Sequence, residues 1–435
     1  MGAMTFPGVT AALDRYLRPD VAAPLAVGFS GGGDSLALLI LTLGWARAHC
    51  RRVISLTVDH RLDPASAAWT AAALAKAAAL GAEVRALAWT GDKPTTGLPA
   101  AARAARHGLL AAAARQAGAR VLLLGHTADD LAEAAAMRNE GSSVSDPRVW
   151  APSPAWPEGR DLFVLRPLLG VGRQALRAGL SARGETWLDD PANEDLKYAR
   201  ARARRVLASS PPLGTGAWAG RADVEPTDRV AKAVITAPTP PPQPRPASGM
   251  GYIALPRSAP TAQVAAACLC AAGTTRPPRG ERLQRLVGRL RAGETFTATL
   301  AGARIEAAGD AVGVFREPGE AFRAKPSQAD GPATEGMPLP VGETRVWDGR
   351  FEITALATGL TVAALRGRAA RLPPAQRQAL KAVAAAARPA LPVVIDATGA
   401  VSCPILAGES LALARCLVQS RFEAACGLID QEPAT

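Results

Sequence analysis

Six residues near the start of the chain, Ser30–Ser35, read Ser-Gly-Gly-Gly-Asp-Ser. They directly follow an apolar run, Leu25–Phe29, and directly precede a helix-like stretch that begins at Leu36. A strand that feeds a glycine-rich turn and then a helix directs backbone N–H groups and the positive end of the helix dipole at an anion, typically phosphate. The carboxylate of Asp34 is unfavourable beside phosphate unless a hard cation such as Mg²⁺ bridges the two. The loop therefore predicts a nucleotide site with a metal ion.

A second polar cluster, His126–Asp130, follows the apolar run Val121–Gly125 and opens another helix-like stretch. Two adjacent acids, Asp129 and Asp130, fall in its first turn. One interpretation is an ordinary helix cap, because negative charge is favourable at a helix N-terminus. The functional interpretation is that one carboxylate binds Mg²⁺ on the phosphates of the nucleotide while the other acts as a base or orients the nucleophile.

Basic residues form two further candidate sites. Arg103 and Arg106 lie three residues apart and so share one face of an expected helix, which either contacts phosphate or substrate or is simply solvated. Later in the chain, five cations make a local basic patch suited to a phosphate backbone. They are Lys197, Arg200, Arg202, Arg204 and Arg205.

The elements that must position these residues alternate from Pro24 to about Met137, where short apolar runs are separated by alanine-rich helical stretches. This alternation predicts a doubly wound parallel sheet with helices on both faces. Ligands of such sheets bind at the carboxyl ends of the strands, so we expect the clusters Ser30–Ser35, Asp59–His60 and His126–Asp130 to meet there. The expected strands are 25–29, 53–58, 84–89 and 121–125, and the expected helices are 35–48, 65–80, 99–117 and 128–137.

The rest of the chain is divided by proline-rich stretches. Residues 237–247 have the composition of a stiff polyproline-like spacer, and residues 317–342 are rich in Pro, Gly and Ala. Smaller α+β modules are expected around them, with helices at 261–272, 280–290 and 376–387 and an antiparallel meander over 295–316. The expected domains are a nucleotide-binding domain over 1–210, a middle helical and α+β domain over 211–330, and a C-terminal module over 331–435.

Composition limits the class of protein. Fifty Lys and Arg against 38 Asp and Glu give a net charge of +12, which favours polyanionic partners. Aromatic residues make up only 4% of the chain, too few for a surface of stacking rings that binds single strands. The six cysteines show no disulfide spacing, and no stretch reaches the roughly 18 apolar residues of a membrane span. A cytoplasmic protein with no membrane association is expected.

Taken in order, these motifs resemble those of the tRNA(Ile)-lysidine synthetases, a family of N-type ATP pyrophosphatases with a PP-loop. The resemblance covers roughly the first half of the chain. It rests on Ser30–Ser35, Val58–His60 with Leu62, Gly97 with Ala102, Arg103 and Arg106, Gly125–His126 with Asp129, Asp130 and Glu133, Arg166–Leu169 with Arg173, and Asp190–Pro191 with Asn193, Asp195, Tyr198, Arg200 and Arg204. The sequence departs from the family's usual residues at Arg61, Pro99, His107, Asn139 and Ala201.

The resemblance implies a Rossmann-like PP-loop fold, the cofactors ATP and Mg²⁺, and a ligase reaction on tRNA. In the family, the C2 oxygen of the wobble cytidine of tRNA(Ile), in its CAU anticodon, attacks the α-phosphate of ATP and pyrophosphate leaves. The ε-amine of free L-lysine then displaces AMP from the adenylated base and forms lysidine. The sequence leaves open whether the chain forms a homodimer.

The resemblance also implies a role for individual residues. The residues implied in ATP binding are Ser30, Gly31, Gly32, Gly33, Asp34, Ser35, Asp59, His60 and His126. Those implied in catalysis are Asp34, Arg103, Asp129 and Asp130, with Asp34 and Asp129 at the metal. Those implied in tRNA or phosphate contacts are Arg106, Lys197, Arg200 and Arg204, with a tRNA-binding module over 331–435.

Three other functions stay open at this point. A tRNA thiolase of the same superfamily adenylates a base in the same way but needs a reactive cysteine, and Cys268 and Cys270 are typical of buried packing. A non-catalytic RNA-binding protein would not need the complete loop with its acid pair. An amidating synthetase that acts on a small carboxylate would form AMP without RNA.

Overall fold

The computed structural model describes residues 4–142, 146–188, 199–208, 250–319, 336–406 and 410–434. Contacts between residues divide the chain into two compact units. The first comprises Met1–Pro238 together with Ile429–Thr435, and the second comprises Thr239–Leu428. Within the described ranges, no helix is long and apolar enough to cross a membrane.

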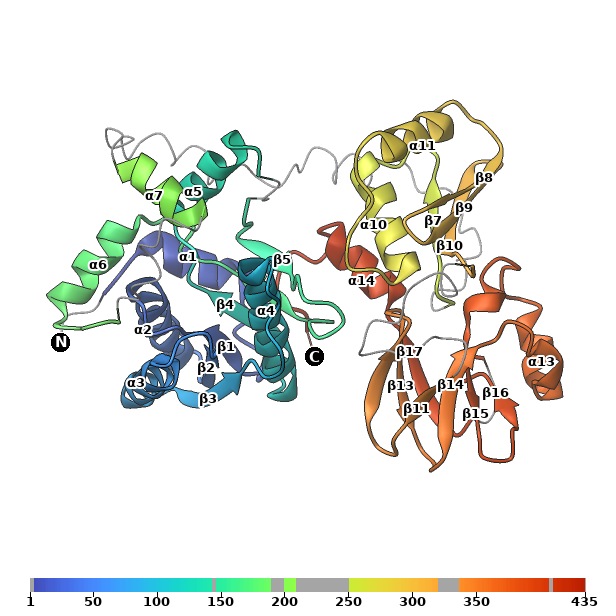
Figure 1. Cartoon of the computed structure of the whole chain (residues 1–435), viewed down its shortest axis with the longest axis horizontal. Coiled ribbons are helices and arrows are strands. Elements are labelled where there is room, and N and C mark those ends of the chain that lie inside the picture. The colour runs from blue at the N-terminus through green and yellow to red at the C-terminus, as the bar shows by residue number, and fades with distance from the viewer. Residues whose placement is uncertain are drawn as a thin grey trace. The chain divides into compact units, whose positions relative to one another are not determined.

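The first unit is built on a six-stranded sheet with the strand order β3-β2-β1-β4-β6-β5 (Figure 1). Its strands are β1 Leu25–Gly28, β2 Val53–Asp59, β3 Glu83–Ala88, β4 Val121–Leu124, β5 Trp150–Pro152 and β6 Phe163–Leu165. Five strands are parallel, and β5 adds an antiparallel edge beside β6. The expected doubly wound α/β fold is confirmed, whereas the antiparallel edge strand was not among the expected elements.

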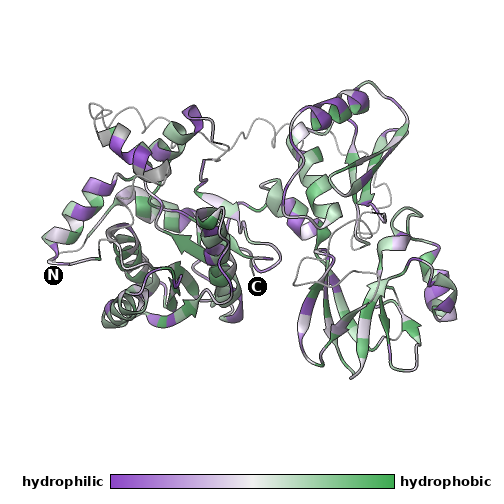
Figure 2. Ribbon diagram, in the orientation of Figure 1, coloured by the Kyte–Doolittle hydropathy of each residue, from purple (hydrophilic) through white to green (hydrophobic). Residues whose placement is uncertain are grey.

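Helices cover both faces of this sheet, because successive residues of a strand point to opposite sides. Leu25 and Val27 of β1 belong to a hydrophobic core that includes residues of α1, α2, α3 and α6, whereas Ala26 belongs to a core that includes residues of α4. The central strands of this sheet are accordingly mostly green, or hydrophobic, in Figure 2. The helices of this unit are α1 Pro7–Tyr16, α2 Gly33–Ala48, α3 Ser66–Ala79, α4 Leu98–Gln116, α5 Ala128–Asn139, α6 Arg173–Ala182 and α7 Ala199–Ala208.

The strand order changes direction at β1, which pairs with β2 on one side and β4 on the other. The segments that leave the carboxyl ends of β1 and β4 therefore flank the topological switch point, where doubly wound sheets bind ligands. Gly125 permits them to approach closely, since a Cβ at this position would lie 3.2 Å from backbone atoms of Asp34. The two polar clusters expected from the sequence thus meet at one edge of the sheet.

The last residues of the chain pack within the first unit. Both carboxylate oxygens of Glu432 accept hydrogen bonds from the guanidinium of Arg51, each at 2.7 Å, and these two side chains are 0% and 1% exposed. The backbone N–H of Arg18 donates to the same carboxylate at 3.0 Å, and the N–H of Glu432 donates to the carbonyl of Tyr16 at 2.8 Å. This C-terminal segment is therefore an integral part of the first unit's packing.

The second unit contains two hydrophobic cores. The first lies between an antiparallel sheet of order β7-β10-β9-β8 and three helices, and the second is enclosed by sheets of order β11-β14-β15-β16 and β12-β13-β17. The elements of the first are β7 Ile253–Pro256, α10 Thr261–Ala272, α11 Glu281–Arg291, β8 Phe296–Leu300, β9 Ala303–Ala308, β10 Ala311–Arg316 and α14 Val418–Ala425. Those of the second are β11 Met337–Leu339, β12 Thr344–Trp347, β13 Phe351–Ala355, β14 Leu360–Ala364, α13 Pro374–Leu380, β15 Pro392–Ile395, β16 Val401–Ser402 and β17 Ala412–Cys416, with short 3-10 helices at Ala369–Arg371 and Arg388–Ala390.

The expected meander and the first two helices of this unit are confirmed by β8 to β10, α10 and α11. The helix expected over 376–387 is wrong in its second half, because α13 ends at Leu380. After Leu380, the guanidinium of Arg388 donates to the carbonyls of Val383 and Lys381, and a short 3-10 helix begins at Arg388. The three-domain division stays a prediction, since the contacts define two units.

Candidate active site

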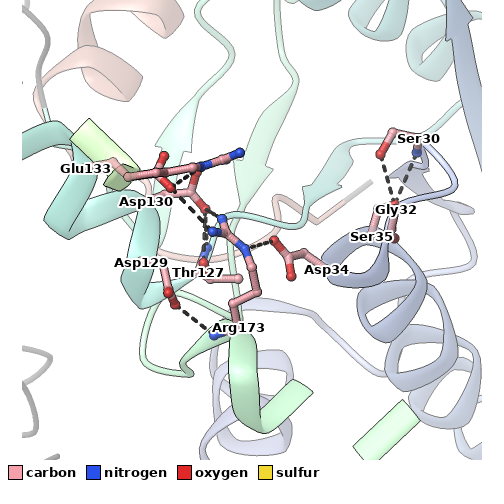
Figure 3. Close-up of polar contacts among 10 residues, drawn as sticks. Ser30, Gly32, Asp34, Ser35, Thr127, Asp129, Asp130, Glu133 and Arg173 are labelled. Atoms are coloured by element: carbon pink, nitrogen blue, oxygen red, sulfur yellow. Dashed lines mark hydrogen bonds and ion pairs between the residues drawn. The ribbon is translucent and has the colours of Figure 1, made fainter. Parts of the chain in front are cut away.

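The glycine-rich loop between β1 and α2 is organised by its own serines (Figure 3). The hydroxyl of Ser35 donates to the carbonyl of Gly32 at 2.9 Å, accepts from the N–H of Ser30 at 3.2 Å and lies 3.2 Å from the Ser30 hydroxyl. Ser35 is buried, whereas Ser30 is exposed. Ser35 therefore fixes the turn, and the Ser30 side chain lies at the surface of the site.

The glycines of the loop have distinct structural roles. Gly31 has a φ of +84°, and a Cβ there would lie 2.7 Å from the side chain of Leu188. Gly32 is the N-cap of α2 and Gly33 its first residue, and no side chain in the described part of the chain caps this helix. The first N–H groups of α2 thus have the arrangement that binds anions at helix N-termini. The N–H of Leu188 donates to the carbonyl of Gly31 at 3.0 Å, so Leu188 contacts the loop through its backbone as well as its side chain.

The two adjacent acids at the start of α5 both have structural partners. Asp130 accepts from the N–H of Thr127 at 2.8 Å and from its hydroxyl at 3.1 Å, which closes a capping box. Asp129 accepts from the backbone N–H of Arg173 at 2.7 Å and so anchors the first turn of α6. The helix-cap interpretation is therefore confirmed for Asp130. Asp130 is 6% exposed, and Asp129 is more accessible.

The side chain of Arg173 connects these acids to the glycine-rich loop (Figure 3). Its Nε lies 2.9 Å from Oδ2 of Asp34, its Nη1 3.4 Å from Oε1 of Glu133 and its Nη2 3.8 Å from Oδ2 of Asp130. Glu133 is 1% exposed and has a second cation, since Nε of Arg204 lies 2.6 Å from Oε1. Burial alone would lower the pKa of Arg173, but its hydrogen bond to Asp34 and the charges of the acids outweigh burial, so the pKa is raised overall. We call Asp34, Asp129, Asp130 and Glu133 the acidic cluster.

The fit of this site to a divalent cation can be judged from Asp34. Its Oδ2 binds Arg173, whereas its Oδ1 is buried and has no hydrogen-bond partner among the described residues. Hard cations such as Mg²⁺ prefer carboxylate oxygens, so Asp34 fits a metal ligand. No group of three or more His, Cys, Asp or Glu side chains converges to form a complete metal site in the part of the chain that the structure describes.

His126, at the carboxyl end of β4, is held in one neutral form. Its Nδ1 lies 3.2 Å from Nε of Arg166, whose guanidinium can only donate, so Nδ1 accepts and Nε2 carries the proton. Arg166 is itself fixed by donation to the carbonyl of Arg148 at 2.9 Å. Burial, followed by the charge of Arg166, lowers the pKa of His126 to about 3. His126 can therefore donate a hydrogen bond from Nε2 across the neutral pH range.

Arg103 and Arg106 of α4 lie close to the histidines of the site. Burial lowers the pKa of His107 to about 3, and the charges of Arg103 and Arg106 lower it further. The pKa of His60 is lowered by burial and then by Arg106. Both arginines also contribute to the lowered pKa of His126. The structure thus places the expected arginine pair beside the carboxyl ends of the strands.

The other residues expected from the sequence have varied positions. Asp59 ends β2 and accepts from the N–H of Arg61 at 2.8 Å. Arg204 contacts Glu133 in the acidic cluster. Lys197 and the side chain of Arg200 lie outside the described residues.

Sequence reasoning gave no site role to Arg166, Arg173 or Glu133, although all three stand in the segments that carry the family resemblance. The available signal was local: Arg166 directly follows the apolar run of β6, at the carboxyl end of a strand. Arg173 and Glu133 have no such local signal. Arg173 contacts Asp34 across 139 residues, and Glu133 of α5 contacts Arg173 of α6.

Comparisons with known proteins show the family of the chain. Residues 7–210 match the model of a PP-loop domain family. The chain is 54% identical to the tRNA(Ile)-lysidine synthase of Caulobacter vibrioides over 99% of this chain and 100% of that protein. It is 35% identical to the tRNA(Ile)-lysidine synthase of Rhizobium meliloti, over 78% and 75% of the two chains, and 36% identical to that of Methylobacterium nodulans, over 70% and 94%.

Among solved structures, the U34-tRNA thiolase NcsA from Methanococcus maripaludis, with its [4Fe-4S] cluster, is 18% identical to this chain. It covers 46% of this chain and 70% of its own length at a TM-score of 0.37, a likeness too weak to support a function. The similarity to the Caulobacter protein extends along nearly the whole chain. The chain therefore belongs to the tRNA(Ile)-lysidine synthase family.

Proposed function

We propose that the site at the β1 and β4 switch point carries out the reaction of this family. ATP is split to AMP and pyrophosphate while lysine is ligated to C2 of the wobble cytidine of tRNA(Ile) through an adenylated base. The observation that carries the proposal is the position of Asp34, which lies in the first turn of α2 after the phosphate-type loop and is joined by Arg173 to Asp130 and Glu133. One site thus offers N–H donors for a polyphosphate beside carboxylates for a cationic amine.

The loop supplies the electrostatic part of the reaction. When the C2 oxygen attacks the α-phosphate, negative charge leaves with pyrophosphate, and donors already aimed at that charge lower the barrier. The uncapped N–H groups at the start of α2 and the Nε2–H of His126 are such donors. Asp34 would hold Mg²⁺, which when bound neutralises charge on the phosphates. Asp129 is the second proposed metal ligand.

The acidic cluster suits free lysine as the second substrate. Asp34 and Glu133 lie beside the guanidinium groups of Arg173 and Arg204 there, and carboxylates of this kind can also attract the ammonium group of lysine. The amine must lose a proton before it attacks C2 and displaces AMP. We assign that proton to a carboxylate of the acidic cluster that does not hold the metal ion.

The tRNA is the polyanionic partner that the basic composition favours. Arg103 is proposed to contact the reacting phosphate or cytidine and Arg106 the tRNA backbone, because both lie near the histidines of the site. In the second unit, α11 exposes Arg282, Arg285 and Arg289, which agrees with a role of this unit in RNA binding (Figure 2). The module over 331–435 is likewise proposed to hold tRNA.

The decisive experiment supplies ATP, radiolabelled lysine and bulk bacterial tRNA, with and without ribonuclease. Label is expected on RNA, and it should depend on ATP and be lost after digestion. Asp34→Asn should reduce labelling by at least about 100-fold, as expected when a group that stabilises transition-state charge is lost. Asp310→Asn, the same chemical change at an exposed turn, is the matched control. Wild-type labelling by Asp34→Asn, or AMP formation without RNA, would refute the proposal.

A further inference from the structure

The side chain of Arg173 contacts Asp34 of the glycine-rich loop and also Asp130 and Glu133 of α5. Its shortest contact is to Asp34 at 2.9 Å, and its contacts to Glu133 and Asp130 are longer, at 3.4 Å and 3.8 Å. Glu133 already has Arg204 at 2.6 Å. The guanidinium of Arg173 is therefore committed mainly to Asp34.

This contact sits on the carboxylate that fits a metal ion. Arg173 occupies Oδ2 of Asp34 and leaves Oδ1 buried without a partner among the described residues. A divalent cation on Asp34 and a guanidinium within hydrogen-bond distance of the same carboxylate repel each other strongly in a partly buried site. Arg173 and Asp34 are 19% and 22% exposed, so water screens this repulsion only in part. The two cations consequently compete for Asp34.

The anchoring of Arg173 determines which part of it can move. Its backbone N–H donates to Asp129 at 2.7 Å and it is the first residue of α6, so the main chain is held. The long side chain can rotate while its Cα stays fixed. A guanidinium released from a carboxylate is well suited to a phosphate, since its planar donors match both groups.

We propose that Arg173 is a positioning residue that occupies Asp34 in the empty protein and leaves it when a divalent cation and a polyphosphate bind, its guanidinium then pairing with a phosphate oxygen. Metal binding and nucleotide binding are thereby coupled through one side chain. A metal alone binds weakly because it must displace Arg173. The polyphosphate removes that obstacle by offering the guanidinium another partner. This inference rests on the proposed ATP site.

The test measures Mn²⁺ binding by electron paramagnetic resonance on the full chain, without nucleotide. Arg173→Gln should bind Mn²⁺ about tenfold more tightly than the wild type, a coupling within the usual range for linked sites. Arg177→Gln is the matched control, because it removes the same charge from the same helix one turn away at an exposed position. Its Mn²⁺ affinity should stay within about twofold of wild type.

A second measurement keeps the proposal testable if Arg173→Gln fails to fold. The Nε–H resonance of Arg173 is followed by NMR in the wild-type chain labelled at arginine, and it is assigned by its absence from Arg173→Lys. Mg²⁺ together with a non-hydrolysable ATP analogue should shift this resonance. No shift on saturation would overturn the proposal, as would equal Mn²⁺ affinities for Arg173→Gln and wild type.

A failure of the proposed ATP site and a failure of the competition by Arg173 would give different results. If the ATP analogue does not bind the wild-type chain, the proposed nucleotide site itself is wrong. If the analogue and Mn²⁺ bind together normally but Arg173→Gln leaves the nucleotide-free Mn²⁺ affinity unchanged, the proposed function stands and only the competition by Arg173 is refuted.

Discussion

The strongest structural prediction concerns Glu432, whose carboxylate is buried against Arg51 at 2.7 Å. In Glu432→Gln the charge is lost while the shape is kept, and the guanidinium of Arg51 remains buried without a counter-charge. Breaking a buried pair in this way typically costs about 3–5 kcal/mol. For a unit of this size each kcal/mol lowers Tm by about 2–4 °C, so Tm should fall by roughly 6–20 °C.

The assay is urea or thermal unfolding of the full chain followed by tryptophan fluorescence. Trp150 is a local reporter, since its indole N–H donates to the carbonyl of Ile429 in the C-terminal segment at 2.8 Å. The control is Asp20→Asn, which removes an exposed ion pair with Arg18 and should leave stability nearly unchanged. The double variant Arg51→Met with Glu432→Leu should recover part of the loss, because neither charge is then left buried alone.

Equal unfolding midpoints for Glu432→Gln and Asp20→Asn would refute the stabilising role of the buried pair between Arg51 and Glu432. In that case the C-terminal segment would not contribute to the stability of the first unit. A chain that ends at Leu428 provides an independent check, since it removes the same contacts without leaving a glutamine in place.

Two further predictions concern pH and cysteine chemistry. The pKa of His107 is about 3 in the folded protein and about 6.5 when unfolded, so the unfolded state binds more protons between these values and stability falls as pH drops from about 6.5 towards 3. At pH 5 the loss of stability relative to neutral pH is about 2 kcal/mol. Unfolding of His107→Gln should therefore depend less on pH, and an unchanged pH dependence would contradict the burial of this imidazole. Burial also raises the pKa of Cys268 and Cys270 to about 12, which leaves their thiolates unavailable at neutral pH. Lysine labelling of tRNA should therefore persist within about threefold when all six cysteines are replaced, and its loss in a folded variant would favour thiolation.

Much of the first unit could be predicted because its signals are local. Each strand of the parallel core is an apolar run followed by a polar turn, and the helices between them are rich in alanine, so the pattern repeats within short windows. The loop Ser30–Ser35 was identified for the same reason, since its anion-binding character depends on neighbouring residues and on the element at either side. The family resemblance added the reaction, which no local pattern could supply.

The helix expected over 376–387 shows where local signals fail. Its composition favours a helix throughout, yet α13 ends at Leu380, and the carbonyls of Lys381 and Val383 accept hydrogen bonds from Arg388. For Arg204 the basic patch stays a prediction, and the structure adds an ion pair with the buried Glu133 that no local pattern indicates. A helix propensity worth only fractions of a kcal/mol per residue does not by itself decide where a helix ends.

The amino-acid sequence alone therefore determined the class of fold, the position of the phosphate loop and the family, because these depend on residues that are close together in the chain. Only the tertiary structure decided that Arg173 reaches Asp34 across 139 residues and that Glu432 reaches Arg51 across 381. The physical reason is that an ion pair needs its partners within a few ångströms in space, whatever their separation along the chain. Charged residues of this kind have no distinguishing local pattern, so their partners become visible only once the fold has placed them.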